Sequence, residues 1–223
     1  MSSHTHEGHH PALQHHFFDM EQQHESVKLG VWLFLLTVIL LFGGLFCFYA
    51  LYRAHHPELF IAMAHFLDWK MGAINTCVLI ISSVTVALAI RSIQQNKAKE
   101  CAVLLGVTIA LAGVFLVIKY FEYTHKFEMG IFPGEYFASQ DVLNAATAAG
   151  QANPHSFFSI YFLMTGLHGL HVVFGMIFLG WLLWRTLKGN YDSVNYVGIE
   201  MGGLYWHLVD LIWIYLFPLM YLI

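Results

Sequence analysis

Two histidines in an apolar stretch are the first residues of this chain that could do chemistry. His168 and His171 lie three residues apart in "TGLHGLH" (165–171), inside a run that is long enough to form a membrane helix. Residues with this spacing share one face of a helix. Imidazoles at membrane depth are candidate ligands for heme or a metal ion. One helix cannot supply both axial ligands of a bis-histidine heme, so a heme would need His207 as its second ligand.

A second polar pair lies in the next apolar stretch, where His207 and Asp210 are again three residues apart. Counting at about 1.5 Å per residue from the connecting loop places Asp210 and His171 at similar depth. We therefore predict that the two pairs form a structural polar clasp, in which an imidazole donates a hydrogen bond to the Asp210 carboxylate. A metal site of His168, His171 and Asp210 is an alternative, but such a closed, apolar site lacks an entry path.

The whole chain has the composition of an integral membrane protein. Of its 223 residues, 58% are hydrophobic and 11% are charged, whereas about 25% of the residues in soluble domains are charged. A spanning helix needs roughly 20 mostly apolar residues, and five stretches meet that length. We predict an all-α integral membrane bundle of five transmembrane helices, with spans at about 28–51, 70–89, 101–121, 157–184 and 197–223.

Polar segments lie outside these spans. Residues 1–27 are expected to form a polar, histidine-rich N-terminal tail, and residues 28–223 the transmembrane domain. The histidines of the tail follow no fixed metal-ligand geometry, so we expect a solvated tail, although they could also catch divalent metals. The longest connection, about 122–155, is expected to contain one short helix.

The basic residues predict the orientation of the chain. Six lysines and arginines fall on the N-terminal side of the membrane and four on the other, and Lys97, Lys99 and Lys188 of the first group lie in short loops. Positive residues in short loops favour the cytoplasm. We therefore expect a cytoplasmic N-terminus and a C-terminus outside.

The composition also argues against several function classes. A net charge of −4 and the lack of a basic run argue against a nucleic-acid partner. The sequence has no phosphate-binding loop and no nucleophile elbow. Cys47, Cys77 and Cys101 have no metal-ligand spacing, and we interpret them as small apolar side chains within the bundle.

Five stretches of the chain resemble subunit III of the heme-copper terminal oxidases, and they occur in the order of that family. The most specific are "YFLMTGLHGLHVVFGM" at 161–176 and "GLYWHLVDLIWIYLFPLMYL" at 203–222. The others are "KLGVWLFLLTVILLFGGLF" at 28–46, "NTCVLIISSVTVALA" at 75–89 and "KYFEY" at 119–123. The chain resembles the bacterial five-helix form that occurs in cytochrome c oxidases of the caa3 or aa3 type.

This resemblance implies a multi-pass protein of the bacterial plasma membrane that acts without a redox centre of its own. Heme and copper are expected in partner subunits, chiefly the catalytic subunit I, with subunit II, small subunits or a respiratory supercomplex as further partners. The complex would reduce oxygen and pump protons. The implied roles of this chain are to stabilise subunit I, to bind structural phospholipids and to support proton uptake.

Particular residues follow from the same resemblance. Matching residues whose implied role is contact with lipid or with another subunit are Trp32, Glu122, Trp206 and Trp213. Glu200, about one turn inside the last span, is a further candidate for a lipid head group, or else a solvated interfacial acid. One position departs from the family, which commonly has a glutamate after the Ser or Thr that follows "WLFL". Val38 stands there after Thr37, so no role of that carboxylate can be carried over.

Other functions remain open at this point. Subunit III does not contact the electron donor, so a quinol oxidase or a homologue associated with nitric oxide reductase is an alternative. A small membrane b-type cytochrome is an alternative from another class. A proton-conducting transporter is disfavoured, because the first three spans lack an acid near their middle.

Overall fold

The fold is a bundle of long helices. The computed structural model describes residues 19–132, 137–148, 150 and 154–223, and within them it contains helices and connections but no strand. Five helices are long and apolar enough to cross a membrane: α1 (Met20–His55), α3 (Trp69–Gln94), α4 (Ala98–Glu128), α6 (His155–Leu187) and α7 (Val197–Tyr221). The prediction of an all-α bundle with five spans is confirmed.

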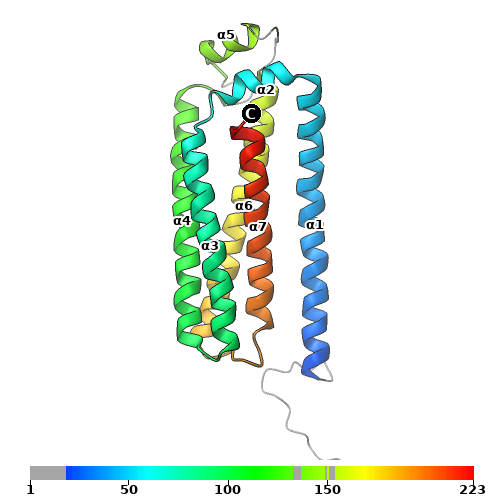
Figure 1. The fold of residues 1–223 in the computed structure, drawn as a ribbon, viewed down its shortest axis with the longest axis vertical. Coiled ribbons are helices and arrows are strands. Elements are labelled where there is room, and N and C mark those ends of the chain that lie inside the picture. Colours follow the sequence, from blue (N-terminus) through cyan, green and yellow to red (C-terminus); the bar gives the residue numbers. More distant parts are fainter. Residues whose placement is uncertain (1–18, 133–136, 149, 151–153) are drawn as a thin grey trace, which may run out of the picture.

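The helices are arranged around α7, the last helix. It packs against α3, α6 and α1, and α3 and α4 lie side by side (Figure 1). In the most apolar window of α7, 50% of the residues are buried inside the chain, whereas only 17% are buried in that of α1. The core of the bundle therefore lies between α3, α4, α6 and α7, while most of the surface of α1 faces outward.

Helix α1 is joined to the bundle mainly near its C-terminal end. The hydroxyl of Tyr49 donates a hydrogen bond to the backbone carbonyl of Leu219, near the end of α7. The last carbonyls of a helix have no partner within that helix, so Leu219 is free to accept this bond. The ring of Tyr49 also packs edge-on against Phe60, with the ring centroids 5.3 Å apart. These contacts fix the end of α1 against the neighbouring helices.

Two short helices lie at one end of the bundle, together with the C-terminus (Figure 1). These are α2 (Pro57–Ala64) and α5 (Gln140–Ala148), and we refer to this end as the α2 end. Helix α5 is the short helix predicted between 122 and 155. Helix α2 was not predicted, although Pro57 at its first position is a recognised start signal, because proline has no N–H to leave unpaired there.

Four of the spanning helices extend beyond their predicted spans, and α1 and α4 do so by the most residues. Helix α1 begins at Met20 instead of Lys28, because the Asp19 side chain caps it by accepting a hydrogen bond from the backbone N–H of Gln22 at 2.7 Å. The helix therefore includes residues 20–27 of the predicted tail, and residues 1–18 of that tail lie outside the described part of the chain. Helix α4 continues past the predicted end at Phe121 to Glu128, because the charged residues beyond it pair within the helix.

Candidate functional site

His168 lies in the core of the bundle among aromatic rings. Its side chain is completely buried on α6, with its ring centroid 5.1 Å from that of Trp213 on α7 and 5.6 Å from that of Phe115 on α4. Neither of its ring nitrogens has a hydrogen-bonding partner among the described residues. His168 therefore meets α7 through the Trp213 indole and not through the expected carboxylate.

His171 points to a different neighbour. Its Nδ1 donates a hydrogen bond to the carbonyl of Leu167, one turn back on the same helix, at 2.8 Å. Its ring packs edge-on against Phe42 of α1, with the centroids 5.1 Å apart. Positions three apart differ by about 60° around a helix. That rotation turns His171 toward α1 while His168 faces α4 and α7.

Of the second polar pair, only His207 forms a side-chain hydrogen bond within the part of the chain that the structure describes, and its partner is on α3 and not on α6. The Nδ1 of His207 lies 2.6 Å from the hydroxyl oxygen of Ser83. Asp210 is 1% exposed, and neither of its carboxylate oxygens has a hydrogen-bonding partner among the described residues. The predicted hydrogen bond from an imidazole to Asp210 is thus not made. Ser83, which sequence reasoning missed, takes the bond with His207.

Both tryptophans of the last span bond across the bundle core. The Nε1 of Trp206 donates to the hydroxyl of Ser82 at 3.1 Å, and that of Trp213 donates to the hydroxyl of Thr76 at 3.1 Å. Both indoles are 0% exposed in this chain. This corrects the expectation that they contact lipid or another subunit: they join α7 to α3. Trp32 is 58% exposed on α1, as a lipid or interface position requires.

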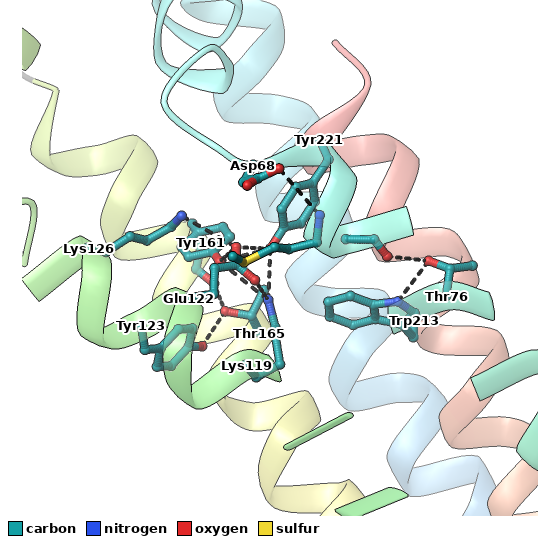
Figure 2. A network of polar contacts seen from close by, with 12 residues as sticks. Asp68, Thr76, Lys119, Glu122, Tyr123, Lys126, Tyr161, Thr165, Trp213 and Tyr221 are labelled. Carbon is teal, nitrogen blue, oxygen red and sulfur yellow. Dashed lines mark hydrogen bonds and ion pairs between the residues drawn. The ribbon is translucent and has the colours of Figure 1, made fainter. Parts of the chain in front are cut away.

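The most polar site of the core is a cluster of charged residues and tyrosines near the α2 end, shown in Figure 2. Glu122, on α4, is 2% exposed and lies at its centre. Its Oε2 accepts a hydrogen bond from the Nζ of Lys119 at 2.8 Å, and its Oε1 accepts one from the Nζ of Lys126 at 3.4 Å. Since these residues are three and four positions apart, one helix face presents all three charges.

Two other helices complete this charge cluster. The hydroxyls of Tyr161 on α6 and Tyr221 on α7 each donate to the Oε1 of Glu122 at 2.7 Å. The Nζ of Lys119 also donates to the Tyr221 oxygen at 2.8 Å and lies 4.8 Å over the ring of Trp213. Glu122 thus connects α4, α6 and α7, and it lies in the core and not at the lipid or partner surface where it was expected.

Sequence reasoning identified only part of this cluster. The sequence analysis named Glu122 through the family resemblance, whereas Lys126 lies five residues beyond the predicted end of the span at 121. The spacing of Lys126, four residues after Glu122, was the signal that could have found it. Tyr161 and Tyr221 carry no such signal, because tyrosine is common at membrane-helix ends.

A pocket opens beside the cluster at the α2 end. It has a volume of 260 Å³, and its lining combines apolar side chains with the polar and charged side chains of His65, Asp68, Glu122, His125 and Lys126. The carboxylate of Asp68 caps α3 by accepting from the backbone N–H of Lys70 at 2.9 Å.

The position of the missing family glutamate lies in a small cluster of apolar side chains. Val38 is 3% exposed on α1 and packs with Phe42 of the same helix and Ile212 of α7. The hydroxyl of Thr37 donates to the backbone carbonyl of Phe34 at 2.6 Å, within its own helix.

Glu200 lies at the opposite end of the bundle, in the first turn of α7, where it is partly exposed. A carboxylate in that position interacts favourably with the helix N-terminus. No group of three or more histidines, cysteines, aspartates or glutamates that could hold a metal ion occurs among the residues that the structure describes.

Comparison with known proteins covers nearly the whole chain. Residues 7–140 and 127–223 match the family described as cytochrome c oxidase subunit III. The cytochrome c oxidase subunit 3 of Synechocystis sp. is 32% identical over 202 residues, which cover 90% of this chain and 77% of that protein. The cytochrome c oxidase subunit 3 of Thermostichus vulcanus is 30% identical over 207 residues, which cover 92% of this chain and 92% of that protein. The probable cytochrome c oxidase subunit 3 of Rickettsia bellii is 28% identical over 91% of this chain and 70% of its own length.

Proposed function

The chain belongs to the cytochrome c oxidase subunit III family, and from that premise we propose that it stabilises the catalytic subunit I of a proton-pumping oxidase and binds structural phospholipids. It is a non-catalytic subunit and a multi-pass bacterial membrane protein. Members of this family are generally without redox centres. Heme and copper are therefore assigned to partner subunits, and the names of the relatives favour cytochrome c as the electron donor.

One observation carries the stabilising role: the chain uses its polar residues to hold its own helices together. The ionisable cluster around Glu122 and the indole hydrogen bonds of Trp206 and Trp213 all join helices of this chain. Such bonds give a rigid bundle. A rigid bundle with apolar outer faces suits a scaffold that packs against another membrane subunit.

Two surface grooves favour phospholipid binding. An apolar groove of 570 Å³ lies between α1, α6 and α7 and is lined mainly by aliphatic and aromatic side chains, which suits acyl chains. A second pocket of 310 Å³ lies near the first turns of α1 and α7 and contains Arg185, with no acid among its lining residues. The guanidinium lies 5.0 Å over the ring of Trp181 and 5.5 Å over that of Tyr191. Arginine held at an aromatic membrane interface favours a lipid phosphate.

The orientation that we propose places the connection between α3 and α4 in the cytoplasm. Lys97 and Lys99 are exposed in and after this connection, and Lys188 is exposed at the same end of the bundle. The positive-inside rule then assigns the α2 end to the outside. Support of proton uptake on the cytoplasmic side is the remaining part of the proposed role and rests on the family resemblance.

An absorption spectrum tests the assignment against the b-type cytochrome alternative. The chain should be purified alone in detergent and also as part of the complex that copurifies with it. We expect no Soret band from the chain alone and a heme spectrum from the complex. A Soret band that scales with the isolated chain and disappears in His171→Ala would overturn the proposal.

A further inference from the structure

Three buried polar side chains in the bundle core have no hydrogen-bonding partner among the described protein atoms. Asn75 on α3 and His168 on α6 are completely buried, and Asp210 on α7 is 1% exposed. Both polar atoms of each of these three side chains are without a partner. Native proteins satisfy nearly all buried polar groups with protein or with ordered water, so three unpaired side chains in one core need a common explanation.

The three side chains lie on three helices in the neighbourhood of one indole. The ring of His168 lies 5.1 Å from that of Trp213, measured between centroids. The indole Nε1 donates to Thr76, the residue next to Asn75 in the chain, at 3.1 Å. Asp210 precedes Trp213 by three residues and so lies one turn away on the same helix. Three different helices therefore present an unpaired polar group close to Trp213.

Burial limits what the missing partner can be. These side chains are inaccessible in this chain alone, so no side chain of another subunit can reach them. No set of ligands suited to a metal ion occurs among the described residues. The partner must be small, and it must donate to a carboxylate and also bond with an amide and an imidazole. Water satisfies all of these conditions.

We propose that the core around Trp213 binds ordered water molecules, which bridge Asp210, His168 and Asn75 and so join α7, α6 and α3. The waters take the place of the direct bond between imidazole and carboxylate. The hydroxyl of Ser83 lies beside the Asp210 carboxylate, and its bond with His207 extends the polar region along α3.

Polar side chains connect this site with the α2 end. The Nζ of Lys119 lies 4.8 Å over the Trp213 ring and is bonded to Glu122. Glu122 and Lys126 line the 260 Å³ pocket that opens at that end. Polar groups thus continue from the pocket to the indole, and they lower the cost of admitting water into an otherwise apolar bundle.

A density map of the assembled oxidase, at a resolution that shows water, tests this proposal directly. We expect discrete density within hydrogen-bonding distance of the Asp210 carboxylate and of at least one polar atom of His168 or Asn75. Protein atoms packed directly against these groups, with no such density, would overturn the proposal.

Thermal dissociation of the subunit from the complex gives a second test. In a dry core, Asn75→Leu removes an unpaired polar group and should raise the midpoint. In a hydrated core it removes a partner of the bound water, and we expect the midpoint to fall by about 2–4 °C. The control is Thr108→Val. This change removes the Thr108 hydroxyl, which forms a hydrogen bond with the Thr85 hydroxyl at 2.8 Å and donates one to the Leu104 carbonyl at 2.9 Å. It should lower the midpoint in either case. An unchanged or raised midpoint for Asn75→Leu contradicts the proposal.

Discussion

The hydroxyl of Tyr221, the last residue of α7, donates a 2.7 Å hydrogen bond to the carboxylate of Glu122 on α4. It is one of several bonds that gather the ends of three helices around a single buried acid. Removing one member of a buried ion cluster leaves the other charges without compensation. The α2 end of the bundle therefore depends on Glu122 more than on any apolar contact of similar size.

Replacement of Glu122 should strongly destabilise the subunit. In Glu122→Gln, the amines of Lys119 and Lys126 lose their counter-charge while they stay buried, and the expected cost is about 3–5 kcal/mol. The measurement is the midpoint of thermal dissociation of the subunit from the purified oxidase. Glu100→Gln is the matched control, because Glu100 pairs with Lys97 at 3.4 Å with 58% of its side chain exposed. The control should change little, and equal midpoints for the two variants would contradict the account.

Close packing between α6 and α7 can be tested at Gly175. A Cβ at this position would lie 2.7 Å from the ring of Trp206, which is itself fully buried and bonded to Ser82. Overpacking of this kind typically costs about 1–3 kcal/mol, so Gly175→Ala should lower the yield and the melting midpoint of the subunit. Gly180→Ala, on the same helix with nothing within 4 Å of the added Cβ, should be neutral or slightly stabilising. A neutral Gly175→Ala would show that the two helices are not this close.

How far the sequence predicts this molecule can be judged from particular residues. Hydropathy locates the five spans, because roughly 20 apolar residues in a row have few other uses. It places the end of α4 too early, because the pairing of Lys126 with Glu122 allows a charged turn to be buried. Residue counts predict a similar depth for His171 and Asp210, but they do not predict the partners of these side chains. Partners depend on the rotation of each helix, which packing with α3 and α4 decides.

Restoring the family's glutamate should harm this chain. The glutamate side chain would enter an apolar cluster with Phe42 and Ile212. Burying an unpaired carboxylate costs several kcal/mol, so Val38→Glu should reduce the amount of subunit recovered with the oxidase several-fold. Val38→Met, which keeps the site apolar, should be recovered close to the normal level. Normal recovery of Val38→Glu would show that a polar partner reaches this position.

Phospholipid binding depends on Arg185 if the pocket beside it holds a lipid phosphate. Arg185→Gln keeps a polar side chain but removes the charge and the bidentate donors. We expect fewer phospholipids to be retained per oxidase in native mass spectrometry after detergent washing. Lys99→Gln removes an exposed charge at the same end of the bundle and serves as the control. Equal lipid retention in both variants would exclude Arg185 as a lipid ligand.

The working life of the oxidase without this subunit tests the central claim most directly. Oxygen consumption should be followed from the first turnover in complexes purified with and without the chain. If the chain stabilises subunit I without taking part in the chemistry, we expect a similar initial rate of oxygen consumption in both preparations. Activity should then be lost much earlier in the preparation that lacks the chain. Immediate loss of all activity on removal, or equal lifetimes in the two preparations, would contradict this account.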